Sequence, residues 1–171
     1  KLNNHTQYEL DGEVVIVSTD KDFLQLVSDK VSVFSPTKKK LYNRQVVFDE
    51  FGIWPQNLLL YRTLDGDKSD NIPGIKGCGI KTLLKRFPEL SEDRLITHDE
   101  FFQMCEDKQG KIKLYADILE AKDQLLMNKR LMELKEPHIP TEKKLKILDR
   151  FREDDVEFNK LDFLRVGAKY K

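Results

Sequence analysis

The alternation of apolar and polar positions predicts a small sheet near the start of the chain. Val14–Val17 is a continuous run of β-branched residues, which is typical of a parallel strand buried on both faces. An apolar stripe of helical spacing follows at residues 23–27, and residues 31–34 alternate as a second strand would. This order predicts a βαβ unit, and residues 41–47 predict a third strand after a turn.

From residue 48 onwards the pattern is helical, with proline and glycine marking the breaks. Pro55 stands where a proline commonly opens a helix, and the apolar positions of that helix continue to Leu64. Residues 71–79 are rich in turn-forming residues, and a short helix over residues 80–87 stops before Pro88. Further helices are predicted over residues 99–106, 111–134, 142–151 and 155–164.

These elements predict an α/β fold in one domain. Residues 1–50 form the sheet portion and residues 51–171 a helical region, and 171 residues are enough to enclose a core. No stretch approaches the roughly 18 consecutive apolar residues of a membrane span, and no signal peptide opens the chain. We therefore expect a cytoplasmic monomer. The chain starts without Met, and we expect it to begin inside a longer protein.

Charge, cysteine and histidine narrow the possible functions. A net charge of zero argues against a protein that coats nucleic acid indiscriminately, but it allows a local basic patch. Cys78 and Cys105 have no ligand spacing and are expected as reduced thiols. Three isolated histidines form no zinc-binding pattern and are expected in surface or loop positions: His5, His98 and His138.

The first candidate for chemistry is a pair of acids after the first strand. Asp20 and Asp22 follow Val14–Val17 at its carboxyl end, where open α/β sheets bind their ligands. Carboxylates there can point into one site and bind a cation. An equally good alternative is that Asp20 caps the next helix and Asp22 interacts with the helix dipole.

A second acidic group lies at the end of the helix that Pro55 opens. Asp65, Asp67 and Asp70 fall within six residues. Carboxylates this close disfavour one another's ionisation unless a cation relieves them, and Mg²⁺ and Mn²⁺ prefer oxygen ligands. The alternative is a turn rich in Asp, Gly and Asn, in which Ser69 and Asn71 cap the local backbone.

Closely spaced glycines follow and open a helix with basic residues. The run that starts at Gly74 reads GIKGCGIKT. Glycines let a backbone approach a phosphate without a Cβ in the way, and the amides of the next helix can face an anion. The run therefore predicts a helix–hairpin–helix over about residues 64–88, which holds duplex backbone without reading sequence. A glycine-rich connection between packed helices is the alternative.

These motifs, in this order and spacing, resemble the 5′-nuclease family. The resemblance runs from STDKDFLQLV, starting at Ser18, to GDKSDNIPGIKGCGIKT, starting at Gly66, and covers nearly the whole chain from about Glu13. The family includes the 5′-nuclease domain of bacterial DNA polymerase I, phage 5′ exonucleases, the T-even phage RNase H and eukaryotic flap endonucleases. Residues 163–169 also resemble the ending of the phage members, so a phage replication enzyme in the host cytoplasm is the expected subgroup.

The resemblance implies a PIN-like, Rossmann-like sheet and roles for individual residues. Asp20 and Asp22 match one acidic pair and Asp67 and Asp70 a later one, which implies ligands for two Mg²⁺ or Mn²⁺ ions. Asp65 lies outside the motif. The hairpin implies a potassium ion on the backbone carbonyls of three residues: Gly74, Ile75 and Cys78. It also implies contacts with the DNA backbone from Lys76, Gly77, Gly79, Lys81, Thr82 and Lys85.

The implied reaction is hydrolysis of a phosphodiester near a 5′ end, with two metal ions about 4 Å apart. One ion activates water, the other stabilises the leaving oxygen, and the acids act as ligands. The family's first half adds further acids and a basic helical arch that this chain lacks, and Glu9 and Asp11 do not replace them. The chain is therefore expected to carry only part of the metal cluster.

The expected substrates are duplex DNA or an RNA–DNA duplex with a 5′ end or flap. The preference for exonuclease or flap-endonuclease action, and for RNA or DNA, is left open by these residues. A sliding clamp and a single-strand-binding protein are the expected partners. The competing interpretations are a duplex-binding module without catalysis, in which the Asp residues are structural, and a nuclease-like scaffold for protein interactions.

Overall fold

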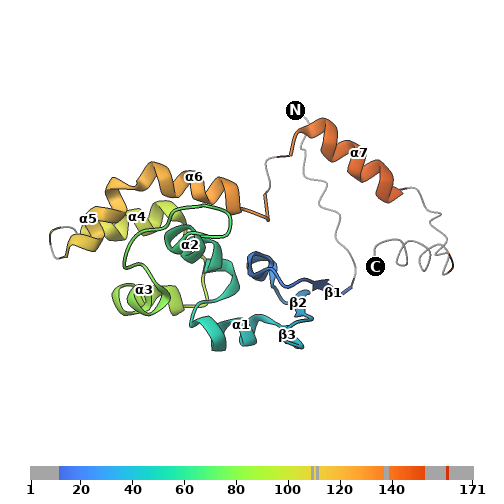
Figure 1. The fold of residues 1–171 in the computed structure, drawn as a ribbon, viewed down its shortest axis with the longest axis horizontal. Coiled ribbons are helices and arrows are strands. Elements are labelled where there is room, and N and C mark those ends of the chain that lie inside the picture. The colour runs from blue at the N-terminus through green and yellow to red at the C-terminus, as the bar shows by residue number, and fades with distance from the viewer. Residues whose placement is uncertain (1–11, 109, 111, 137–138, 153–160, 162–171) are drawn as a thin grey trace. The chain divides into compact units, whose positions relative to one another are not determined.

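The computed structural model describes residues 12–108, 110, 112–136, 139–152 and 161 (Figure 1). The chain divides into two compact units, residues 1–137 and 138–171. The second unit contains α7, Thr141–Arg152, which confirms the helix expected over residues 142–151. Apart from Leu161, the helix expected over residues 155–164 and the tail at 163–169 lie outside the described residues, as do His5, Glu9, Asp11 and His138.

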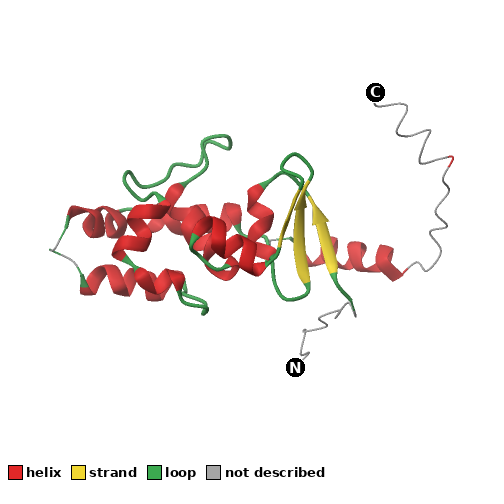
Figure 2. Ribbon diagram, turned by 90° about the horizontal axis from the view of Figure 1, so that it is seen from below, coloured by secondary structure: helices red, strands yellow, loops and turns green. Residues whose placement is uncertain are grey.

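Three short strands form one sheet in the order β1-β2-β3 (Figure 2). β1, Val14–Val17, runs parallel to β2, Val31–Ser35, and β3, Lys40–Tyr42, pairs antiparallel with β2. The expected parallel pair and the existence of a third strand are thereby confirmed. The connection between β1 and β2 is a 3-10 helix, η1 (Lys21–Leu26), instead of an α-helix.

The expectation that β1 is buried on both faces is wrong. Val15 is 54% exposed and Val17 is 68% exposed, whereas Val14 and Ile16 on the other face are half-buried. β1 is an edge strand that pairs only with β2 in the described part of the chain, and no described element covers Val15 and Val17.

The third strand ends earlier than the apolar pattern predicts. β3 stops at Tyr42, and residues 44–47 belong to helix α1, Arg44–Phe51. Asn43 explains the change, because its side-chain oxygen accepts a hydrogen bond from the amide of Val46 at 2.9 Å and caps the helix. Such a cap contributes about 1 kcal/mol, which is enough to decide between helix and strand for a short segment.

The helical region is organised around α2, Pro55–Asp65, which lies in the middle of the first unit (Figure 1). Its first residue is proline, as expected, and it packs against η1, α1 and α6. The short helix α3, Ile80–Arg86, is also confirmed, and it is followed by the 3-10 turn η2, Pro88–Ser91.

The helix expected over residues 111–134 is two helices, α5 (Lys113–Glu120) and α6 (Lys122–Met132). The chain bends at Ala121 because the two halves pack on different partners. α5 packs on α4, His98–Asp107, whereas α6 packs on α2. One straight helix could not cover both. Within the described residues no helix is both long enough and apolar enough to cross a bilayer.

An aromatic group holds α3 in place. Phe87, directly after α3, packs on Phe101 of α4 with ring centroids 4.6 Å apart and on Tyr115 of α5 at 5.6 Å. Phe87 and Phe101 are fully buried, which contributes about 2–3 kcal/mol for each side chain. A helix of 7 residues is unstable in isolation, so these contacts determine where α3 lies.

His98 is buried, so the surface or loop position expected for it is wrong. It opens α4, and its Nε2 lies 3.2 Å from Thr63 Oγ1 of α2. The Thr63 hydroxyl donates to the Leu60 carbonyl, so the Nε2–H of His98 donates to Thr63. Burial, aided by the positive charge of Lys129, lowers the pKa of His98 to about 4. The imidazole is therefore neutral at pH 7.

His98 should make the stability of the fold depend on pH. Its pKa falls from 6.5 to about 4 on folding, so the unfolded chain takes up the proton first. The contribution of His98 to the free energy of unfolding should be complete above about pH 6.5 and fall as the pH approaches about 4. In urea denaturation across this range, His98→Gln should lose less stability than the wild type. Parallel losses in both proteins would contradict this assignment.

Candidate metal centre and glycine hairpin

Three carboxylates from two distant segments converge on one surface. Asp22 lies in the first turn of η1, and Asp67 and Asp70 lie in the loop after α2. One oxygen from each lies within 4.8 Å of the others, an arrangement that could hold a metal ion. Packing of α2 against η1 brings the segments together. The structure therefore unites three of the four acids predicted from the sequence.

Asp67 is held in a tight loop by its own backbone and side chain. Its amide and carbonyl exchange hydrogen bonds with Ile72 at 2.8 and 2.7 Å. Its Oδ1 accepts from the Ser69 hydroxyl at 2.5 Å and the Ser69 amide at 2.8 Å. These bonds, led by the Ser69 hydroxyl, lower the pKa of Asp67 to about 2. A capped turn thus exists, with Asp67 as the accepting side chain, and the same bonds fix the direction of its carboxylate.

Arg62 of α2 lies between two of the acids. Its Nε donates to Asp22 Oδ1 at 2.9 Å, and its Nη2 donates to Asp67 Oδ2 at 2.5 Å. Burial raises the pKa of Asp22 above its ordinary value, and the guanidinium opposes that effect. The sequence analysis missed Arg62. A basic residue in the last turn of a helix is common, and its role depends on η1, 40 residues earlier in the chain.

Asp20 lies outside the group of three. Its Oδ1 accepts the Asp22 amide at 2.9 Å and caps η1, which is the structural role weighed for it from the sequence. Its proposed role as a metal ligand stays a prediction. Asp65 also lies outside the group, because its carboxylate accepts a hydrogen bond from the Tyr61 hydroxyl at 3.1 Å.

The backbone crosses itself at Gly66 and Gly74, on either side of the acidic loop. A Cβ on Gly74 would lie 2.0 Å from the Asp65 carbonyl oxygen, and a Cβ on Gly66 would lie 2.4 Å from the Gly74 amide. Gly66 also has a φ of +75°. Only glycine fits this crossing, which returns the chain to the end of α2 before the hairpin begins.

The hairpin leads directly into α3. The Ile75 amide donates to the Leu64 carbonyl at 2.7 Å, and the Cys78 amide donates to the Ile75 carbonyl at 3.1 Å. Cys78 is buried, and burial raises the pKa of its thiol to about 12, so it serves as an apolar anchor. A Cβ on Gly77 or Gly79 would meet nothing within 4 Å, so the outer side of the hairpin is open.

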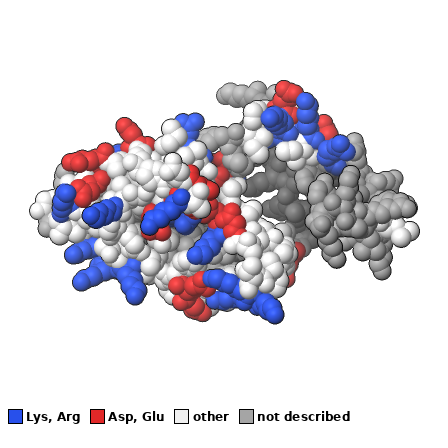
Figure 3. Space-filling view, viewed as in Figure 1, with Lys and Arg blue, Asp and Glu red and all other residues white. Residues whose placement is uncertain are grey.

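Basic side chains project from this side of the molecule. Lys76, Lys81 and Lys85 are exposed, and Thr82 is half-buried. Figure 3 shows positive side chains gathered over α3. Lys38 and Lys40, near the β2–β3 turn, instead bind Glu50 at 3.0 and 2.8 Å. Lys38 and Lys40 are therefore engaged within the protein.

Helix α6 braces the loop and the sheet portion at once. Asn128 is buried, and its Nδ2 donates to the carbonyls of Thr63 at 3.0 Å and Pro73 at 2.8 Å. Gln25 of η1 donates to the Met132 carbonyl and accepts from the Leu134 amide. These amides tie η1 and the acidic loop to one helix, which limits how far the acids can separate.

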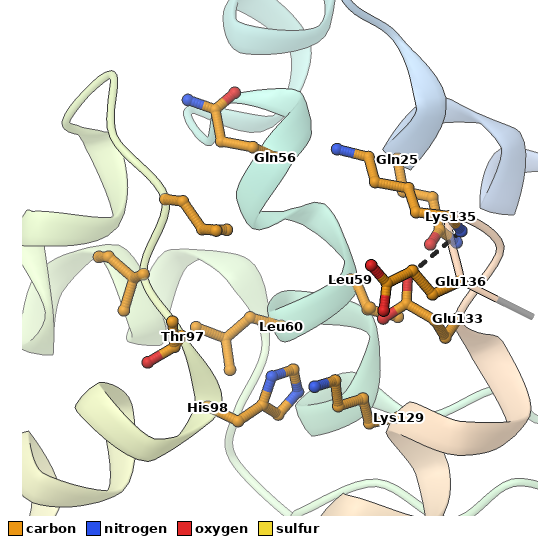
Figure 4. Close-up of a pocket in the computed structure, with 12 residues that line it drawn as sticks. Gln25, Gln56, Leu59, Leu60, Thr97, His98, Lys129, Glu133, Lys135 and Glu136 are labelled. Atoms are coloured by element: carbon orange, nitrogen blue, oxygen red, sulfur yellow. Dashed lines mark hydrogen bonds between the residues drawn. The ribbon is translucent and has the colours of Figure 1, made fainter. Parts of the chain in front are cut away.

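A cavity of about 230 Å³ lies on another side of α2 (Figure 4). Leu59, Leu60 and His98 line it, and so do Lys129 of α6 and Glu133 directly after that helix. None of the three clustered acids lines this cavity. The candidate metal centre therefore lies outside this cavity.

No protein-family model matches the chain. A search of curated proteins finds the 5′-3′ exonuclease of Bacillus subtilis, which is 35% identical over 129 residues, covering 72% of this chain and 41% of the relative. The chain is a homologue of the 5′-3′ exonucleases. Other relatives are named DNA polymerase I. The chain spans less than half the length of each of these relatives.

Solved structures support the same relationship. The structure of bacteriophage T5 5′-exonuclease with bound zinc ions matches with a TM-score of 0.56 and 25% identity, over 70% of this chain and 42% of the other. A complex of the T5 flap endonuclease with DNA and metal ions matches with a TM-score of 0.58 at 24% identity, over the same share of each, and shows the shared fold. This chain is thus a mixed α/β protein with a small sheet and many helices, like the T5 enzyme.

The crossing at Gly66 and Gly74 predicts an unequal response to two similar substitutions. Gly74→Ala should lower the free energy of unfolding by about 3 kcal/mol, because the Asp65 carbonyl must move to admit the methyl group. Gly79→Ala, where a Cβ meets open space at a φ of −62°, should change it by less than about 0.5 kcal/mol. Chemical denaturation of both variants measures the difference, and equal losses would refute the proposed constraint.

Proposed function

We propose that this chain is the part of a metal-dependent 5′ nuclease that holds duplex nucleic acid beside a cluster of metal-binding acids. The observation that carries the proposal is the convergence of Asp22, Asp67 and Asp70 next to the glycine hairpin. Homology to 5′-3′ exonucleases supports it. The reaction is hydrolysis of a phosphodiester near a 5′ end, by exonuclease or flap-endonuclease action.

The acidic group fits a hard divalent ion. All three donors are carboxylates, which Mg²⁺ and Mn²⁺ prefer, and the Arg62 guanidinium shows that a cation is already favoured between Asp22 and Asp67. A divalent ion supplies Lewis acidity to water and to the leaving oxygen. Ser69 orients Asp67, and η1 presents Asp22. Asp20 is proposed as a further ligand, and two ions as the full complement.

The hairpin is proposed to grip the substrate. Helix α2, the loop to Gly79 and helix α3 would act as a helix–hairpin–helix, with the open side of Gly77 and Gly79 against the sugar–phosphate backbone. Lys76, Lys81 and Lys85 would neutralise phosphates. Thr82 is proposed to add a hydrogen bond, and a potassium ion to bind the carbonyls of Gly74, Ile75 and Cys78.

The wider setting is also part of the proposal. Duplex DNA or an RNA–DNA duplex with a 5′ end or flap is the proposed substrate, and a sliding clamp and a single-strand-binding protein are the proposed partners. The proposed domain division places nuclease core at residues 1–50 and the binding region at residues 51–171. We further propose that the protein acts in phage DNA replication, as a monomer in the cytoplasm of the host cell.

Loss of two acids should separate cleavage from binding. Asp67→Asn with Asp70→Asn should reduce Mg²⁺-dependent cleavage of a 5′ flap by at least about a thousandfold, or about 4 kcal/mol in the barrier. Duplex affinity should stay within about threefold, because the hairpin is untouched. The assay uses this chain joined to the part of its Bacillus subtilis relative that lies outside the match, with a 5′-flap DNA and an RNA–DNA duplex as substrates.

Asp65→Asn is the matched control, because Asp65 bonds to Tyr61 outside the cluster and should keep cleavage near the wild-type rate. The 171-residue chain is assayed in parallel to measure its own activity. Full cleavage by the double variant would reject the metal assignment. An extended protein that binds the duplex but never cuts would favour the non-catalytic binding module.

The basic hairpin face should set the salt dependence of duplex binding. The logarithm of the binding constant falls with the logarithm of salt concentration in proportion to the phosphates neutralised, by about 0.9 for each. Lys81→Ala with Lys85→Ala should therefore flatten that slope by about 2. The control, Lys30→Ala with Lys113→Ala, removes two exposed lysines elsewhere and should leave the slope unchanged. Fluorescence anisotropy with a labelled duplex measures both, and equal slopes would exclude the hairpin as the contact surface.

A further inference from the structure

Arg62 binds the same carboxylates that the proposed metal ion would bind. Its Nε and Nη2 reach Asp22 Oδ1 and Asp67 Oδ2, one oxygen from each acid. The side chains of Arg62, Asp22 and Asp67 are only 20%, 17% and 17% exposed, so water screens these charges weakly. The guanidinium thus holds η1 to the acidic loop in the absence of metal.

The remaining oxygens are free to receive an ion. Within the described residues nothing donates to Asp22 Oδ2, and the Asp70 carboxylate accepts no hydrogen bond. Asp67 is the exception, because Ser69 occupies Oδ1 and Arg62 occupies Oδ2. An ion that uses all three acids would therefore meet Arg62 at Asp67 Oδ2.

The divalent ion and the Arg62 guanidinium would compete for the oxygens of Asp22 and Asp67. A divalent ion binds carboxylate oxygens at about 2.1 Å, closer than the guanidinium, and a positive group against the same oxygens would repel it at short range. Arg62 also has a second hydrogen-bond acceptor, because its Nη1 lies 3.4 Å from the Gly66 carbonyl at the end of α2. Carbonyls at a helix C-terminus attract a cation.

We propose that Arg62 is an internal counter-ion that positions Asp22 and Asp67 in the metal-free protein and is displaced when a divalent ion binds. This inference rests on the proposed metal site. Arg62 is a positioning residue, since it acts through the two acids. It keeps like charges on η1 and the loop together before the ion arrives, and it weakens ion binding because it competes for the same oxygens.

The test is Mn²⁺ binding, followed by electron paramagnetic resonance of the free ion, with the 171-residue chain. Arg62→Gln should bind Mn²⁺ about tenfold more tightly, because a competing charge is gone. Without metal its melting temperature should fall, and saturating Mn²⁺ should restore most of the loss. Arg44→Gln is the matched control, since Arg44 also bridges two acids, Asp29 and Asp93, away from the site, and its Mn²⁺ affinity should equal that of the wild type.

A second measurement needs no variant. In the metal-free wild type, the Nε proton of Arg62 should exchange slowly with water. Mg²⁺, added as a diamagnetic substitute for Mn²⁺ at the same concentrations, should shift the resonance of this proton and speed its exchange. The Arg44 resonance should not change. Unchanged or weaker Mn²⁺ binding by Arg62→Gln, or an Arg62 signal indifferent to Mg²⁺, would overturn the exchange while leaving the metal site standing. No Mn²⁺ binding by the wild type would instead reject the metal site itself.

Discussion

The close approach of two backbones at Gly66 and Gly74 is the constraint on which both halves of the candidate site depend. The chain leaves α2 at Gly66, makes the acidic loop and returns at Gly74 to within a distance that admits no Cβ. The acids therefore lie on one side of the crossing and the hairpin on the other. Asn128 of α6 then holds the carbonyls of Thr63 and Pro73, on either side of the loop, so that loop and hairpin are fixed as one piece.

The acidic loop shows that structural and functional roles need not exclude each other. Asp67 accepts the hydrogen bonds from Ser69 that an ordinary turn would make, and its second oxygen binds Arg62, which also binds Asp22. Asp20 caps η1 and thereby orients the turn that presents Asp22. Local hydrogen bonds thus pre-organise the carboxylates, and the charge cost of their proximity is offset by Arg62. The repulsion that would separate the segments becomes an attraction for cations.

The proposed duplex-binding hairpin and the proposed metal centre differ in how much of each the matched segment supplies. The hairpin, α3 and the aromatic group at Phe87 pack within the compact unit of residues 1–137. The acidic cluster has three carboxylates, and the edge strand of the sheet exposes Val15 and Val17. The relatives are more than twice as long as the matched segment. The proposed duplex grip therefore depends less than the proposed catalysis on residues outside the matched segment.

Several local signals predict the structure correctly. Pro55 opens α2, Pro88 follows α3, and the β-branched run at Val14–Val17 is a strand parallel to β2. Errors arose where distant packing or one side chain competes with the pattern. The bond from Asn43 replaced a strand by α1, and different partners for α5 and α6 divided one predicted helix.

The sequence by itself determined the motifs, their order and the family resemblance, because glycines and clustered carboxylates in fixed spacing tolerate few substitutes. It could not show that Arg62 lies between Asp22 and Asp67, or that His98 is buried against Thr63. Each of those facts depends on how α2 packs against η1 and α4. Such packing is a sum of weak contacts between segments far apart in the chain, and only the tertiary structure decides it.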